Sequence, residues 1–147
     1  MTLEKWRGYG WLTRHETSPQ EIADLVEAAD RDISKAAIPE LGPDWQLNIA
    51  HNAAVLIALA ALAARGYRPS REGQRYIALE SLEFTLGLDR STLDELNALR
   101  KRRSLSAYER AGVVSEKDAD AMLRLARDLR GRVGVLLRKE CPDFLGE

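Results

Sequence analysis

A chain of 147 residues is long enough for one domain, and its formal net charge of −1 excludes a generally basic nucleic-acid binder. The charges are unevenly distributed, however. Residues 1–99 hold 10 Lys and Arg against 15 Asp and Glu (net −5), whereas residues 100–147 hold 12 against 8 (net +4). We therefore expect any affinity for a polyanion to lie in the C-terminal third.

Several classes of protein are disfavoured by composition. The single cysteine, Cys141, cannot form an intrachain disulfide, and no cysteine spacing predicts a metal site or a cofactor. Residues 1–11 have no apolar segment behind their positive charges, so they do not resemble a secretory signal. The most apolar run, residues 53–64, is too short to span a bilayer and predicts a buried helix. We expect a cytoplasmic protein that does not associate with membranes.

Residues 1–17 are expected to form an N-terminal arm. Three aromatic residues, Trp6, Tyr9 and Trp11, lie there among glycines. We expect their rings to pack on the rest of the protein or on a partner chain. A single helical domain then spans residues 18–147.

The first two predicted helices follow from caps and breaks. Ser18 begins the first, with Glu21 three residues later as in a capping box, and residues 39–43 end it. Asp44 can cap the second helix, and Gly66 is placed to end it.

Three further helices complete the prediction. The third begins at Ser70 and ends at Gly87, and the fourth begins at Ser91. The fifth begins at Ser115 and ends near Pro142. Because no stretch alternates β-branched and polar residues, we expect no sheet. Short connections between long helices favour antiparallel neighbours, so the expected fold is all-α, an up-and-down bundle of four to five helices.

Four consecutive basic residues interrupt the apolar face of the fourth helix. At about 100° per residue, Arg103 lies within about 20° of Leu96. Arg100 lies about 40° to the other side, whereas Lys101 and Arg102 point away. A guanidinium beside the core needs a carboxylate, a carbonyl, a subunit boundary or an anionic ligand. Helix geometry leaves open whether Arg103 forms a structural salt bridge or holds a phosphate.

The segment "LRKRRSLSAY", residues 99–108, resembles the signature of the HEPN superfamily (higher eukaryotes and prokaryotes nucleotide-binding domain). That signature is an arginine, a polar residue and then a histidine or, in several branches, a tyrosine. Arg103, Ser104 and Tyr108 match these positions. Residues 48–82 are similar to the family's helix of small and apolar residues, its Gly-Tyr turn and the following helix.

The resemblance implies a fold and an activity. Active HEPN proteins are typically metal-independent endoribonucleases that work as dimers, with the arginine on the scissile phosphate and the histidine in acid–base work. Here Tyr108 takes the place of the histidine, and a tyrosine of pKa ~10 is ionised in only about one part in a thousand at pH 7. Tyr108 is therefore a poor general base. In some tyrosine-type systems a minimal nucleotidyltransferase modifies such a tyrosine, which makes Tyr108 a candidate acceptor.

His51 and Asn48 lie on one side of the predicted second helix, which is otherwise apolar. Such polar groups need partners, either from other helices or across a dimer interface. They are either structural, or they line the same phosphate-binding cleft as Arg100 and Arg103.

Three functions stay open at this point. The resemblance implies a HEPN-like module that binds nucleotide or RNA phosphate, non-catalytic or paired with a minimal nucleotidyltransferase in a toxin–antitoxin-type system. The alternative is a metal-independent endoribonuclease, a toxin or RNA-processing enzyme, whose composite dimer site contains Arg103, Tyr108 and Ser104. The third is a structural helical interaction protein with Arg103 in an ion pair. A homodimer is expected for the first two.

Overall fold

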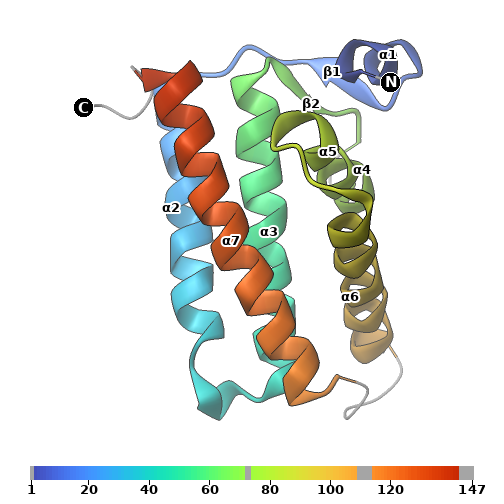
Figure 1. The fold of residues 1–147 in the computed structure, drawn as a ribbon, viewed down its shortest axis with the longest axis vertical. Helices are drawn as coiled ribbons and strands as arrows, with labels where there is room; N and C mark the ends of the chain where they lie inside the picture. The colour runs from blue at the N-terminus through green and yellow to red at the C-terminus, as the bar shows by residue number, and fades with distance from the viewer. Residues whose placement is uncertain (1, 72–73, 109–113, 143–147) are drawn as a thin grey trace.

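The computed structural model describes residues 2–71, 74–108 and 114–142, with residues 104–108 described by their backbone alone. Within these ranges the chain is mostly helical, as expected for an all-α protein. The four long helices alternate in direction, which gives an up-and-down arrangement (Figure 1). These helices are α2 (Pro19–Ala36), α3 (Pro43–Ala64), α6 (Arg90–Tyr108) and α7 (Glu116–Glu140).

The central helix is α3, which packs against both α2 and α7 (Figure 1). Its small side chains allow close approach, and many of them are fully buried. By length and composition α3 could cross a membrane, but 67% of its most apolar window is buried inside the fold. That degree of burial agrees with the expectation of a core helix, although the helix is longer than the apolar run that signalled it.

Two of the predicted helix starts are confirmed by their hydrogen bonds. Ser18 Oγ accepts from the Glu21 backbone N at 3.1 Å, and Ser115 forms a complete capping box with Asp118. The Glu21 side chain does not close its own box, because it bonds His15 and Thr17 instead.

Two predicted caps are wrong by a few residues. Asp44 lies inside the first turn of α3, and the cap is Gly42 at φ +85°, a conformation that favours glycine. The short 3₁₀ helix η1 (Pro39–Leu41) leads into this turn. Helix α6 is capped by Asp89, whose Oδ1 accepts from Thr92 N at 2.9 Å, rather than by Ser91.

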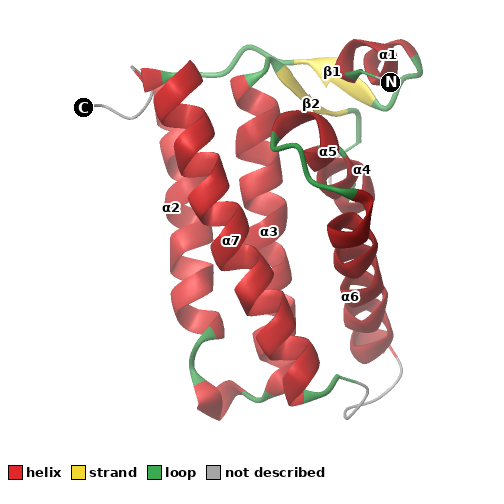
Figure 2. Cartoon of the chain, viewed as in Figure 1, coloured by secondary structure: helices red, strands yellow, loops and turns green. Residues whose placement is uncertain are grey.

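The prediction of no sheet is also wrong. Strand β1 (Leu12–Arg14) pairs antiparallel with β2 (Tyr67–Pro69), as Figure 2 shows. Each strand has three residues, too few for an alternating pattern to be visible in sequence. As a result Ser70 does not begin a helix. The predicted third helix is instead divided into α4 (Arg75–Glu80) and α5 (Leu82–Thr85).

The N-terminal residues fold onto one end of the bundle through α1 (Leu3–Gly8) and β1. Trp6 is buried there and meets Phe84 edge-to-face, with ring centroids 5.1 Å apart. Leu12 is also buried in this small cluster, which includes Leu62 of α3. This packing brings Tyr9 and Trp11 into the same pocket as the first residues of α4.

Candidate functional site

A cleft of about 720 Å³ opens between the α1–β1 turn, the start of α4 and the middle of α6. Its volume falls in the range of roughly 300–1,000 Å³ typical of ligand sites. Four arginines and three exposed aromatic residues line it, and no acidic residue in the described part of the chain does so. We call it the arginine cleft; its lining residues are Tyr9, Gly10, Trp11, Arg71, Gln74, Arg75, Tyr76, Ile77, Arg100 and Arg103.

Helix α6 supplies two of the arginines from positions three residues apart. Arg100 and Arg103 are half-buried on the face toward the cleft, whereas Lys101 and Arg102 are exposed. Arg102 points to α7, where its Nη1 lies 3.6 Å from a carboxylate oxygen of Asp118. The directions predicted from the helical wheel are therefore observed for all four basic residues.

Within the described residues, no carboxylate lies within 4.0 Å of the guanidinium nitrogens of Arg71, Arg75, Arg100 or Arg103. The Nε atoms of Arg100 and Arg103 are buried and have no hydrogen-bond partner in the part of the chain that the structure describes. An unsatisfied buried donor costs about 1–3 kcal/mol, and more for a charged group. Among the described residues, the cleft thus carries concentrated positive charge without a neutralising carboxylate.

The carboxylate of Glu80 feels the charge of Arg100, but among the described residues its hydrogen bonds come from other side chains. It accepts from two nitrogens of Arg90, at 3.0 and 2.8 Å, and from the amide of Asn97 at 2.8 Å. These bonds, chiefly those from Arg90, hold the pKa of Glu80 below its usual value. The carboxylate is therefore ionised but already engaged.

His51 of α3 lies fully buried beneath the arginine cleft. Its Nδ1 is 3.3 Å from Nη1 of Arg75. Because a guanidinium only donates, Nδ1 must accept and the ring proton sits on Nε2, which has no partner. Burial, and then the positive charges of Arg75, Arg103 and Arg100, lower the pKa of His51 to about 3. The imidazole is therefore neutral at physiological pH.

Arg75 is held in place from below. Its Nη2 donates to Asn52 Oδ1 at 3.1 Å, and Asn52 Nδ2 donates to Asp32 of α2 at 2.7 Å. The acidic group thus reaches Arg75 only through a neutral amide. Burial, followed by the field of Arg103, lowers the pKa of Arg75. The guanidinium of Arg75 is thus positioned by neutral hydrogen-bond partners, His51 and Asn52, and forms no ion pair with a described carboxylate.

Sequence reasoning missed Arg75 because a lone arginine in a predicted helix carries no pattern. The signal that could have found it was the pair His51 and Asn52 on an apolar helix, which required a polar partner from another element. Asn48, in contrast, donates to the Asp44 carbonyl of its own helix at 3.0 Å and does not line the arginine cleft. Ser104 and Tyr108 belong to α6, but their side chains lie outside the described residues, so their roles stay predictions.

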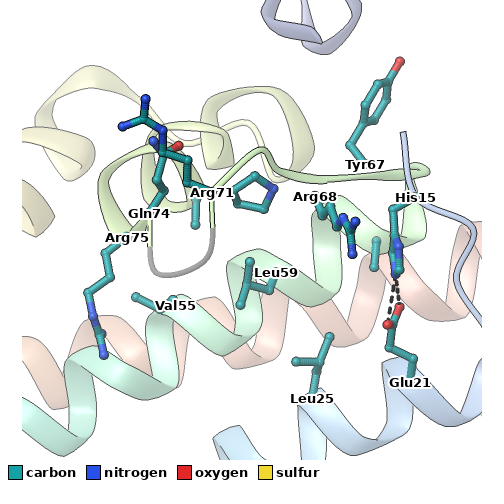
Figure 3. A pocket seen from close by; sticks show the side chains of 13 residues that line it. His15, Glu21, Leu25, Val55, Leu59, Tyr67, Arg68, Arg71, Gln74 and Arg75 are labelled. Atoms are coloured by element: carbon teal, nitrogen blue, oxygen red, sulfur yellow. Dashed lines mark hydrogen bonds and ion pairs between the residues drawn. The ribbon is translucent and has the colours of Figure 1, made fainter. Parts of the chain in front are cut away.

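A second pocket, of about 380 Å³, adjoins the arginine cleft and shares Arg71, Gln74 and Arg75 with it. We call it the apolar pocket, because aliphatic side chains of α2 and α3 form its floor. Figure 3 shows His15 and Glu21 at one end and Arg75 at the other. His15 Nε2 lies 2.7 Å from Glu21 Oε1. The Thr17 hydroxyl, which donates at 2.6 Å, and then His15 lower the pKa of Glu21.

The two pockets differ in charge balance. In the apolar pocket an acidic group faces the histidine, whereas the arginine cleft holds positive charge alone among the residues described. No cluster of three or more His, Cys, Asp or Glu side chains that could hold a metal ion is found in the part of the chain the structure describes. Comparison with known proteins finds no match to a family model, to a curated protein or to a solved structure.

Proposed function

We propose that this chain is a HEPN-like helical module that binds the phosphate groups of a nucleotide or of RNA in the arginine cleft. The observation that carries the proposal is the convergence of Arg75, Arg100 and Arg103 without a carboxylate partner among the described residues. Arginine presents a planar fork of donors that matches phosphate oxygens, and a bound anion would satisfy the buried Nε atoms.

A purely structural role for these arginines is less well supported. A structural ion pair would place Arg103 on an acidic side chain, as Arg130 and Asp30 pair at 2.6 Å elsewhere in the bundle. Instead, Arg103 lies near other positive charge: after burial, its field helps to lower the pKa values of His51 and Arg75. Neutralisation by an added anion would relieve all of these unfavourable contacts together.

Binding without catalysis is the better-supported form of this function. A general base for RNA cleavage needs a pKa near 7. His51 is buried with a pKa of about 3, and a tyrosine in a model peptide titrates near ~10. We therefore place the module as a homodimer or as the partner of a minimal nucleotidyltransferase in a toxin–antitoxin-type system. Tyr108, the last residue of α6, is the candidate acceptor.

The test compares binding of labelled RNA and of ATP to three matched variants. Arg103→Ala and Arg100→Ala each remove a charge-assisted hydrogen bond of about 1.5–3 kcal/mol, so affinity should fall roughly 10- to 150-fold. Lys101→Ala removes the same charge from the outward face of the same helix and should change affinity less than about 2-fold. Equal effects from all three variants, or no binding by the wild type, would refute the proposal.

The same preparations separate the binding module from the endoribonuclease. RNA incubated without metal should stay intact with wild-type protein. Cleavage that Arg103→Ala abolishes would favour the nuclease instead. Mass spectrometry of Tyr108, after incubation with a minimal nucleotidyltransferase and ATP, tests the acceptor role; an unmodified tyrosine would count against it.

A further inference from the structure

The arginine cleft also gathers exposed aromatic side chains. Six large hydrophobic side chains are exposed in the described part of the protein, and three of them line this cleft. All three are aromatic: Tyr9 is 54% exposed, Trp11 41% and Tyr76 49%. They come from two segments distant in sequence, the α1–β1 turn and α4, so their meeting is a product of the fold.

Neighbouring side chains contact the rings of Trp11 and Tyr76, while part of each side chain is exposed to solvent. Trp11 contacts Tyr9 and the buried Trp6, with centroid distances of 5.0 and 5.5 Å. Its backbone is fixed by bonds to Trp6 O and from Ser70 N, each 3.0 Å. The guanidinium of Arg100 lies over the Tyr76 ring, 5.4 Å from its centroid. Arginines and aromatic rings therefore line the same cleft, and one pair of them, Arg100 and Tyr76, is in contact.

We propose that the arginine cleft binds a single-stranded polynucleotide, with bases stacked on Trp11 and Tyr76 and adjoining phosphates on Arg100 and Arg103. The inference rests on the proposed function and adds the class of ligand. Exposed aromatic rings interleaved with arginines form a site for single strands because every unpaired base offers a flat face. In a duplex those faces are hidden within the stack, so a duplex could use the arginines alone.

The experiment measures affinity for four ligands of equal length: single-stranded RNA, single-stranded DNA, an abasic strand and a duplex. The abasic strand keeps the phosphates and lacks the bases. Stacking is worth about 1–3 kcal/mol per base, so the base-bearing single strands should bind at least roughly 5-fold more tightly than the abasic strand. The difference between RNA and DNA shows whether the 2′-hydroxyl contributes.

Substitutions identify the stacking rings. Trp11→Leu and Tyr76→Leu keep apolar volume but remove the flat ring, so each should reduce the advantage of the base-bearing strands over the abasic strand. Trp11→Phe should restore most of it. Trp45→Leu is the matched control, because Trp45 is 63% exposed and does not line the cleft. Thermal melts establish that each variant is folded.

The outcomes separate this inference from the proposal beneath it. If abasic and base-bearing strands bind equally well, and Arg103→Ala weakens both, stacking is refuted while phosphate binding stands. If the wild type binds each of the four ligands no more tightly than the Trp11→Leu variant does, stacking is refuted as well. No binding of any ligand refutes the proposed function and, with it, the inference.

Discussion

Arginines at the ends of the bundle form ion pairs with carboxylates, whereas the described residues offer no such partner to the arginines in the cleft. At the ends, guanidiniums meet carboxylates: Arg90 pairs with Glu80 and Asp94, and Arg65 pairs with Glu140 at 2.8 Å. In the cleft, Arg100 and Arg103 lie beside each other without such a partner in the described residues. The chain has 23 Asp and Glu against 22 Lys and Arg, yet none of the described carboxylates pairs with these two arginines. The difference separates charges that hold the fold from charges that are left for a ligand.

The pKa values of two groups express the same contrast. Hydrogen bonds from Arg7 and Tyr67 lower the pKa of Glu4 to about 2, because they stabilise its charged form. The pKa of His51 falls to about 3 because burial and three arginines destabilise its charged form. Both pKa values are lowered, for opposite reasons: the surroundings of Glu4 stabilise its charged form, whereas burial and the neighbouring arginines destabilise the charged form of His51.

The largest expected effect comes from removing both cleft arginines of α6. We expect Arg100→Ala together with Arg103→Ala to weaken oligonucleotide binding at least ~100-fold, because two charge-assisted contacts are lost. The matched double variant outside the cleft, Arg65→Ala with Arg130→Ala, should leave affinity within about 2-fold. Isothermal titration would measure both, and similar losses in the two variants would erase the distinction between the regions.

A second effect follows from the buried histidine. The unfolded chain binds a proton at His51 below pH ~6.5, whereas the folded chain does so only near its pKa of about 3. Stability should therefore be complete above pH ~6.5 and fall by up to about 2 kcal/mol on acidification to pH ~5. The glutamates with lowered pKa values respond only below their unfolded value of 4.5, outside this window.

Denaturant unfolding at several pH values measures this slope. His51→Gln keeps a hydrogen-bond acceptor for Arg75 and should flatten it between pH ~6.5 and ~5. A slope unchanged by His51→Gln would mean that His51 is not the group responsible.

The smallest effect concerns the stability of the free protein. Removing a charge at the end of the bundle, by Arg65→Ala, should lower the free energy of unfolding by less than about 1 kcal/mol, as for exposed ion pairs. Arg103→Met should instead raise it slightly, by roughly 0.5–1 kcal/mol, since it relieves repulsion and an unsatisfied donor. A substantial loss of stability in Arg103→Met would show that the arginine serves the fold after all.

Much of the fold could be predicted from local signals, and the site only in part. The caps at Ser18 and Ser115 and the glycine after α3 are local, so the long helices could be placed. The directions of Arg100 and Arg103 follow from helix geometry. The short sheet could not be foreseen, because its three pairs join strands more than fifty residues apart.

That sheet explains what sequence reasoning missed about the cleft. Pairing β1 with β2 carries Trp11 to the start of α4, and it also delays that helix until Arg75. Arg75 then reaches His51 and Asn52, the polar pair on α3 whose need for partners was visible in sequence. The partners themselves depend on long-range contacts, which no local pattern encodes.

The most direct test of the central claim is the salt dependence of single-stranded oligonucleotide binding. Each phosphate contact releases bound counterion, so the slope of log K against log salt should become shallower by about 0.7 in Arg103→Ala. Lys101 lies two residues before Arg103 and is exposed on the outward face of α6. Lys101→Ala should therefore keep the wild-type slope. If Lys101→Ala and Arg103→Ala change the slope equally, or neither changes it, the anion does not bind in the arginine cleft and the account is wrong.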